Sequence, residues 1–318
     1  MIITVTLNPS LDRTIEVERL DRGAVIRAVS ARVEPGGKGV NVTRALLANG
    51  VPSRPVLTCG GDDGYRLVRL LQRDGVEPVC VWIDKHTRSN LTLAEPDGTV
   101  TKVNEPGPEL TAADVERVEA ALLAEVTQES TWVVVCGSMP PGLPAESFAS
   151  LCRRVIEAGV RLAVDTSGPA LRAGAEAGAA LLKPNREELA EVIGRPLPGL
   201  TDVIDAAHEL RSWGAGAVLV SLGADGAVLV DDDGILRGSA PVARPRSSVG
   251  AGDALLAGFL AAGAKGETAL AEALAWGAAA VSLPGSRMPG PADLQRDLVR
   301  LEPLVGFGTA EPDHLVEN

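Results

Sequence analysis

The feature that most constrains the fold is an alternation between short β-branched runs and longer segments rich in alanine and leucine. The apolar runs read MIITVTL, VLTC, VCVWI, WVVVCG, RLAVD, AALLK and AVLVSL. Strands that alternate with helices form parallel sheets, because a parallel pair needs a crossover connection, usually a helix. We therefore expect an α/β protein with a doubly wound, mostly parallel sheet flanked by helices.

Residues 90–103 depart from this pattern. In NLTLAEPDGTVTKV, apolar and polar residues alternate on both sides of a Pro-Asp-Gly turn, which is typical of a β-hairpin with one covered face. Together with RTIEVERL near the N-terminus, this hairpin predicts a small β-sheet lid formed by segments of about 10–30 and 85–105. The lid would belong to one domain that spans residues 1–310, and residues 311–318 would form an acidic tail.

Composition and charge exclude several kinds of partner. The chain has 318 residues and a net charge of −12 at pH 7, whereas nucleic acids and anionic membranes bind basic surfaces. An anionic ligand would therefore need a local basic cluster. The four cysteines have no C-x-x-C spacing, and no apolar run is long enough to span a membrane. We expect a cytoplasmic protein with reduced thiols.

Polar residues follow the apolar runs with unusual regularity. They are Gly137, Ser138, Asp165, Lys183, Asn185, Ser221 and Gly223. In a doubly wound sheet such positions fall at the carboxyl ends of the strands, where these folds bind their ligands. The sequence thus predicts one ligand site that collects residues from many strands.

Two glycine-rich segments, GGKGVN at 36–41 and GAGDAL at 250–255, do not match the common nucleotide motifs. The first lacks the Ser/Thr of a Walker A loop, and the second lacks the last glycine of a dinucleotide fingerprint. Phosphoryl transfer to a hydroxyl needs a carboxylate to accept the proton and backbone N–H groups to stabilise charge. Asp253 and the N–H groups of Ala251 and Gly252 could supply both, although Asp253 alone could equally be a helix cap.

Seven segments together resemble the ribokinase-like, PfkB-type carbohydrate kinases. They are TLNPSLDRTIEV (6–17), EPGGKGVNVTRALLANG (34–50), NEPGP (104–108), GSMPPG (137–142), KPNREE (183–188), SLGADGA (221–227) and VGAGDALLAGFL (249–260). Their order and spacing match the family over residues 2–300, and GGKGVN with VGAGD is the most specific combination. The resemblance implies a ribokinase-like fold and a homodimer that forms through the lid.

The resemblance also implies roles for individual residues. Asp253 matches the catalytic base, and the anion hole would comprise Gly250, Ala251 and Gly252. The implied substrate-binding residues are Asp12, Arg27, Gly37, Lys38, Asn41, Arg88, Lys102 and Ser138. Of these, the group expected around the substrate's phosphate is Arg27, Arg88, Lys102 and Ser138. The implied nucleotide-binding residues are Lys183, Asn185, Ser221, Gly223, Gly226 and Gly252.

Two cations enter through the same resemblance. Glu188 would orient Mg²⁺ through water beside ATP, although Asn185 followed by Glu188 three residues later is also a capping-box pattern. Ser247, Val249 and Gly285 match positions that line a monovalent cation (K⁺) site in relatives.

The implied activity is ATP-dependent phosphorylation of fructose 1-phosphate to fructose 1,6-bisphosphate. Tagatose 6-phosphate and fructose 6-phosphate remain alternative substrates within the family. A catalytically silent sugar-phosphate-binding regulator is the alternative from another class. The presence of Asp253 favours an enzyme, because binding alone would not need a base.

Overall fold

The computed structural model describes residues 1–304, so the expected tail at 311–318 lies outside the described residues. Within this range the main sheet has ten strands. In spatial order they are β14 (Arg300–Pro303), β13 (Gly234–Ser239), β12 (Ala227–Asp231), β11 (Ala217–Ser221), β10 (Leu181–Leu182), β9 (Arg161–Asp165), β8 (Trp132–Cys136), β1 (Ile2–Thr6), β4 (Ser53–Cys59) and β5 (Val79–Trp82).

The strands from β5 to β11 are parallel, which confirms the alternation predicted from the sequence. All seven apolar runs contain one of these strands. The remaining strands, β12, β13 and β14, extend one edge in antiparallel pairing. The sheet is therefore mostly parallel, and its antiparallel edge begins directly after the turn that follows β11.

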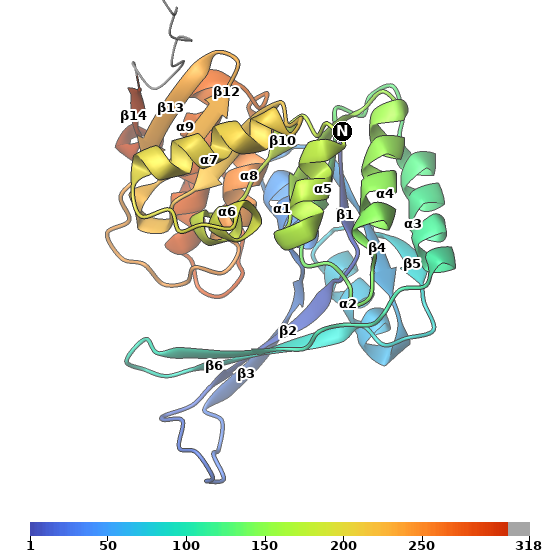
Figure 1. Cartoon of the computed structure of the whole chain (residues 1–318). Helices are drawn as coiled ribbons and strands as arrows, with labels where there is room; N and C mark the ends of the chain where they lie inside the picture. The colour runs from blue at the N-terminus through green and yellow to red at the C-terminus, as the bar shows by residue number, and fades with distance from the viewer. Residues whose placement is uncertain (305–318) are drawn as a thin grey trace, which may run out of the picture.

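Helices cover both faces of this sheet (Figure 1). One face packs against α3 (Ala112–Glu125), α4 (Ala145–Glu157), α5 (Gly168–Glu176), α6 (Arg186–Ile193) and α7 (Leu200–Ser212). The other face packs against α1 (Lys38–Ala48), α8 (Ala251–Ala261) and α9 (Gly266–Val281). In β8, Val133 and Val135 join the first core, whereas Trp132 and Val134 join the second. Successive side chains of a strand point to opposite faces, so a strand covered on both sides is apolar throughout.

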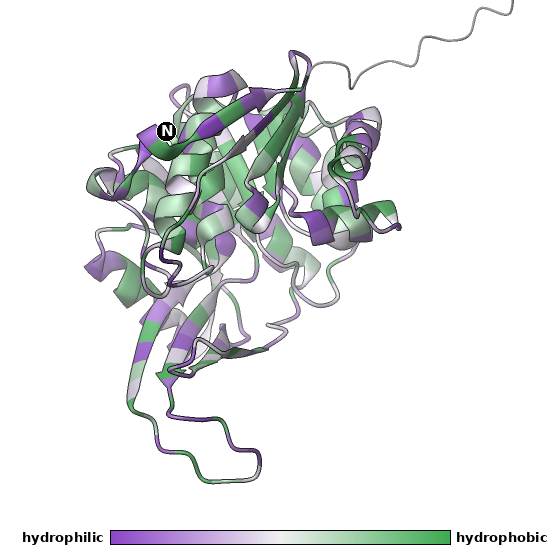
Figure 2. Ribbon diagram, turned by 90° about the vertical axis from the view of Figure 1, so that its left-hand side faces the viewer, coloured by the Kyte–Doolittle hydropathy of each residue, from purple (hydrophilic) through white to green (hydrophobic). Residues whose placement is uncertain are grey.

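The predicted lid is a separate four-stranded sheet with the order β3 (Ser30–Gly36), β2 (Ser10–Glu16), β6 (Arg88–Ala94) and β7 (Val100–Asn104). Strands β6 and β7 form the expected antiparallel hairpin. Strand β3 continues to Gly36, beyond the expected segment of 10–30. The lid projects from the body, and the loop between β2 and β3 extends farthest from it (Figures 1 and 2).

Helix α2 (Gly61–Arg73) lies between the lid and the body, where it contacts β2, β3 and β4. A third apolar cluster joins these elements and includes Leu11 of the lid, Val40 of α1 and Leu67 of α2. The root of the lid is thus packed onto the body. No helix among residues 1–304 is long and apolar enough to cross a membrane.

Candidate active site

Helix α8 begins at the glycine-rich segment that the sequence singled out. Gly250 is its N-cap and has a φ of 77°, a left-handed conformation that favours glycine. A Cβ at this position would also lie 2.5 Å from Cε of Met288. Ala251, Gly252 and Asp253 form the first turn, where backbone N–H groups have no partner within the helix and the helix dipole is positive. The segment is therefore shaped to receive an anion.

Asp253 is buried in that first turn, with 6% of its surface exposed. Its Oδ2 accepts a hydrogen bond of 2.8 Å from Nδ2 of Asn41 on α1. Burial and the nearby charge of Asp165 raise the pKa of Asp253 to about 6, against the opposing effect of Lys38. A carboxyl with a pKa in this range can take up and release a proton near neutral pH, as a general base must.

Charged side chains of both signs lie around Asp253. Lys38 Nζ lies 2.7 Å from Asp165 Oδ1 and 2.9 Å from Glu188 Oε1, and Lys183 Nζ lies 3.2 Å from Asp165 Oδ2. Asp165 is fully buried at the end of β9. Burial alone would lower the pKa of Lys38, but the carboxylates of Asp165 and Glu188 outweigh it and raise that pKa. Lys38 therefore carries its charge into the site.

We call Lys38, Asn41, Asp165, Lys183, Glu188 and Asp253 the catalytic cluster. Lys183 is 3% exposed, and a Cβ on Gly252 would lie 3.5 Å from its Nζ. The ammonium group thus faces the start of α8, where it adds a positive charge to the N–H groups. Lys38 was expected only as a substrate-binding residue, and its ion pairs connect it to Asp165 and Glu188.

The capping-box interpretation of Asn185 and Glu188 is confirmed at the start of α6. Asn185 Oδ1 accepts from the N–H of Glu188 at 2.7 Å, and Glu188 Oε2 accepts from the N–H of Asn185 at 2.9 Å. Since Glu188 Oε1 also accepts from Lys38, both of its oxygens have protein donors. The glutamate therefore combines a structural role with a position inside the catalytic cluster.

The donor set suits a water-mediated Mg²⁺ better than a direct one. Among residues 1–304, no three His, Cys, Asp or Glu side chains converge into a metal cage. Asp165 Oδ2 is buried and makes no hydrogen bond, although Lys183 Nζ lies 3.2 Å away. Mg²⁺ keeps several waters and binds through few carboxylates together with substrate phosphates, so Asp165 and Glu188 fit this ion.

At the root of the lid, Asp12 is held by its neighbours on β2 and β6. Its Oδ1 accepts from Ser10 Oγ at 2.7 Å and from Asn90 Nδ2 at 2.9 Å. Gly36 permits this arrangement, since a Cβ there would overlap the Asp12 carboxylate. Gly37, with a φ of 115°, leads directly into α1. The sugar-binding residues expected from the sequence thus adjoin the helix that carries Lys38 and Asn41.

The residues expected around a substrate phosphate are only partly brought together. Arg88 donates to the Glu105 carbonyl at 2.9 Å and to Ser138 Oγ at 3.2 Å. Asn8 Nδ2 also donates to Ser138 Oγ at 3.2 Å. Arg27 and Lys102 are exposed and make no ion pair with the described residues. We call Arg27, Arg88, Lys102 and Ser138 the lid phosphate group.

The expected nucleotide-binding turn lies beside the capping box. Ser221 forms a parallel bridge with Asn185, which places the end of β11 next to the start of α6. Gly223 and Gly226 have φ angles of 61° and 92°, so both need glycine-like freedom. The turn then reverses the chain into β12.

The possible K⁺-site residues Ser247, Val249 and Gly285 lie in two loops. Ser247 Oγ accepts from the Val249 N–H at 3.2 Å in the segment just before α8. Gly285 lies after α9, against Glu34 of the lid. The described contacts do not bring Gly285 against the other two residues.

Asp165 was expected at the ligand site as a residue at a strand end, but no role was assigned to it. Asn8 and Asn90 were not expected there. Asn8 and Asn90 join Ser138 and Asp12, respectively, through contacts that bridge 130 and 78 residues of chain. Such long-range pairs leave no local pattern in a sequence.

Comparisons with known proteins agree with this geometry. The model of the pfkB family carbohydrate kinases matches residues 5–292. The chain is 38% identical to 1-phosphofructokinase of Rhodobacter capsulatus over 92% of its own length and 94% of the relative's. It is 37% identical to 1-phosphofructokinase of Haloferax volcanii over 95% of this chain and 98% of the relative.

A solved structure supports the same assignment. Phosphofructokinase-2 from Escherichia coli, in complex with potassium, superposes with a TM-score of 0.86 at 32% identity, covering 92% of this chain and 96% of that one. The matching family model, the two relatives and the shared fold lead to one conclusion: the chain belongs to the pfkB family of carbohydrate kinases.

Proposed function

We propose that this protein uses ATP to phosphorylate fructose 1-phosphate on its 6-hydroxyl, giving fructose 1,6-bisphosphate. The observation that carries the proposal is the buried Asp253 at the positive end of α8, with a pKa raised to about 6 by burial. The naming of full-length relatives as 1-phosphofructokinase supports the substrate. A silent sugar-phosphate regulator is not favoured, because it would gain nothing from burying a carboxylate beside an anion site.

Asp253 acts as the general base in this proposal. Asn41 holds Oδ2, which leaves Oδ1 available to accept the proton of the sugar hydroxyl. As the hydroxyl oxygen attacks the γ-phosphorus, the bond from that phosphorus to the β–γ bridging oxygen breaks and ADP leaves. Negative charge on the transferring group is stabilised by the N–H groups of Ala251, Gly252 and Asp253 behind Gly250. Because these groups are already in place, little reorganisation is needed during the reaction.

The nucleotide would lie on the side of the catalytic cluster that carries Lys183. We propose that Lys183 and Lys38 bind donor phosphates, and that the turn of Ser221, Gly223 and Gly226 receives the rest of the nucleotide together with Asn185 and Gly252. Lys38 is the shared element, since it begins α1 next to Gly37 and reaches Asp165 and Glu188. Its ammonium group would stay beside the negatively charged phosphoryl group while that group moves from ATP to the sugar.

Asp165 and Glu188 would hold Mg²⁺ through water molecules. Bound there, the ion would neutralise the donor phosphates of ATP. The K⁺ site remains a proposal for Ser247, Val249 and Gly285, supported by the potassium complex of the E. coli relative.

The lid would bind the sugar phosphate. Asp12, Gly37 and Asn41 are proposed to bind the sugar, with Asp12 accepting hydrogen bonds from its hydroxyls. The lid phosphate group would bind the 1-phosphate, the end of the substrate opposite the reacting hydroxyl. In a chain of net charge −12, this local positive charge is needed to attract a dianion.

Two further proposals concern assembly and compartment. Val25, Val29, Val100 and Val103 of the lid segments are between 51% and 88% exposed, which supports a homodimer that buries the lid. An exposed-valine variant such as Val103→Asp should then shift the sedimentation of the protein toward the monomer. Cys59, Cys80, Cys136 and Cys152 are all free thiols, which supports the reducing cytoplasm as the compartment.

The substrate assignment is tested by measuring ADP release, in a coupled assay, with fructose 1-phosphate, fructose 6-phosphate, tagatose 6-phosphate and unphosphorylated fructose. We expect the highest kcat/KM with fructose 1-phosphate. A higher kcat/KM with either 6-phosphate would contradict the substrate but not the kinase. Absence of ADP release with every sugar would contradict the kinase.

A further inference from the structure

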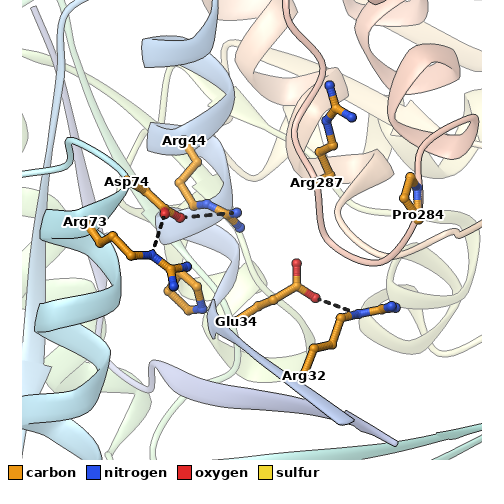
Figure 3. A pocket seen from close by; sticks show the side chains of 8 residues that line it. Arg32, Glu34, Arg44, Arg73, Asp74, Pro284 and Arg287 are labelled. Carbon is orange, nitrogen blue, oxygen red and sulfur yellow. Dashed lines mark ion pairs between the residues drawn. The ribbon is translucent and has the colours of Figure 1, made fainter. Parts of the chain in front are cut away.

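A cavity of about 330 Å³ opens outside the catalytic cluster, between the lid root, α1, the end of α2 and the loop after α9 (Figure 3). Its charged lining consists of Arg32, Glu34, Arg44, Arg73, Asp74 and Arg287. Four arginines against two carboxylates leave an excess of two positive charges. On a chain with a net charge of −12, such a concentration of arginine is not explained by the overall composition.

The carboxylates satisfy these arginines poorly. Arg44 Nη2 and Arg73 Nε share Asp74, at 3.8 Å and 3.5 Å respectively, and both distances exceed those of a charge-assisted hydrogen bond. Arg32 Nε lies 3.3 Å from Glu34 Oε2, and Arg32 Nη1 donates a long hydrogen bond of 3.5 Å to Glu16 Oε1, which does not line the cavity. Arg287 has no ion pair with the residues of the cavity (Figure 3). Several guanidinium N–H groups therefore remain available to an anion.

Arg44 is the most constrained member of this group. Its side chain is 13% exposed, and Nη1 donates to the Ser286 carbonyl at 3.2 Å. Burial lowers the pKa of Arg44, which means that the surroundings disfavour its charge in spite of Asp74. Ser286 Oγ, buried in the adjoining loop, has no hydrogen-bond partner. A bound anion would compensate the positive charge of Arg44 at this wall of the cavity.

The shape and the donors limit what this anion can be. Guanidinium groups bind phosphate oxygens in pairs, in a geometry that lysine cannot offer. A volume near the lower end of ligand pockets suits a small molecule rather than a nucleotide. From these observations we propose that the cavity binds a small phosphate monoester, at a second site separate from the catalytic cluster.

The position of this cavity connects it to both halves of the enzyme. Arg32 belongs to lid strand β3, whereas Arg44 lies one turn beyond Asn41, the residue that holds Asp253. The loop with Arg287 continues into Met288, whose Cε packs against Gly250. A ligand here would bridge the lid strand and the two segments that adjoin the anion hole.

The experiment is a calorimetric titration of the full chain, without nucleotide or sugar, using glycerol 3-phosphate and inorganic phosphate as probes. The test variant is R73Q/R287Q, and the matched control is R66Q/R69Q, which removes the same charge from exposed positions of α2 that do not line the cavity. Kinase activity at saturating substrates serves to show that each variant is folded.

We expect wild type and R66Q/R69Q to bind glycerol 3-phosphate equally, and R73Q/R287Q to bind it at least about tenfold more weakly. Unchanged affinity in R73Q/R287Q, or no binding to wild type at millimolar concentration, would overturn the proposal. Tighter binding of the ester than of inorganic phosphate supports a monoester ligand. Equal or tighter binding of inorganic phosphate contradicts that assignment.

Discussion

The catalytic cluster and the lid phosphate group both hold charge, but they hold it in opposite ways. In the catalytic cluster, the side chains of Asp165 and Lys183 are 0% and 4% exposed, and each has an ionic partner at a fixed distance. In the lid phosphate group, Arg27 and Lys102 are exposed, and Arg88 contacts only neutral oxygens. In the first region ion pairs within the protein fix the charges, whereas Arg27, Arg88 and Lys102 have no ionic partner among residues 1–304.

This difference indicates that phosphoryl transfer and substrate selection depend on different regions of the molecule. Buried charges must be paired and hydrogen-bonded, so their positions are fixed by the fold, and fixed dipoles and charges are what stabilises a transition state. Exposed charges on a lid can be replaced or moved at little cost to stability. We infer that phosphoryl transfer depends on the body, and that the choice among sugar phosphates depends on the lid.

Replacing the base should have the largest effect. Asp253→Asn keeps the size of the side chain but removes the proton acceptor, so kcat should fall by roughly 10²–10⁴ while KM changes little. Steady-state kinetics with fructose 1-phosphate and ATP would measure this. A kcat within a factor of three or so of wild type would show that Asp253 only adds a negative charge to the positive end of α8, whose N-cap is Gly250.

A substitution in the lid should act on binding instead. Arg88→Ala should raise KM for fructose 1-phosphate by roughly 10- to 100-fold, because charge-assisted hydrogen bonds to phosphate are lost. KM for unphosphorylated fructose should remain unchanged. The matched control is Arg19→Ala, which removes an exposed lid arginine that pairs only with Asp21 among the described residues. Equal losses with both sugars would assign Arg88 a structural role.

The pH dependence of kcat/KM distinguishes the role of Asp253 in the body from that of Arg88 in the lid. With the pKa of Asp253 at about 6, kcat/KM should fall about tenfold for each unit below pH 6, since only the carboxylate accepts a proton. In Arg88→Ala the absolute rate should be lower but the midpoint unchanged. A midpoint near 4, the ordinary range of an aspartate, would contradict the raised pKa.

Glu188→Gln should produce a smaller change that separates its two roles. We expect the Mg²⁺ concentration for half-maximal activity to rise by roughly 3- to 10-fold, because a neutral amide attracts the ion's waters less strongly. The control is Asp114→Asn, which alters the corresponding capping box of α3 away from the site. If both variants lower only the Tm and leave the Mg²⁺ titration unchanged, Glu188 is a cap alone.

The substitution Asp253→Asn, which lowers activity, should raise the free energy of unfolding at neutral pH. A carboxyl whose pKa rises on folding favours the folded state below about pH 4, and this contribution is lost as pH rises through about 6. Asp253→Asn should therefore be more stable than wild type at pH 7, by on the order of 2–3 kcal/mol, with no difference at pH 3.5 or so. Urea unfolding at both pH values would measure this. Equal stability at pH 7 would mean that the buried charge costs nothing.

Much of the body could be predicted because its signals are local. Strands covered on both faces are continuous apolar runs, and the capping box of Asn185 and Glu188 lies within four residues. Strand β3 was partly missed because Ser30, Arg32 and Glu34 interrupt its apolar residues and its first three residues are exposed. Its place in the lid depends on pairing with β2 rather than on an apolar run of its own.

The site was predictable to the extent that glycine-rich helix starts mark it. Gly250 and Gly37 adopt positive φ angles, and the sequence alone indicates where these turns lie. The partners of Lys38 could not be predicted in the same way, since Asp165 and Glu188 are 127 and 150 residues away. The direction in which Lys38 points depends on the packing of α1 against β8 and β1. No local sequence pattern predicts that packing.

The pairing of the lid strands has a consequence for folding. The seam between β2 and β6 is parallel and joins Ser10 to Arg88, so it cannot close until the intervening α1, β4, α2 and β5 have returned the chain to that edge. Contacts of such long sequence separation form slowly, because the loop must be closed before the pairing stabilises it. The lid sheet should consequently be completed after the body, and its amides should exchange with deuterium sooner than those of β1 and β8.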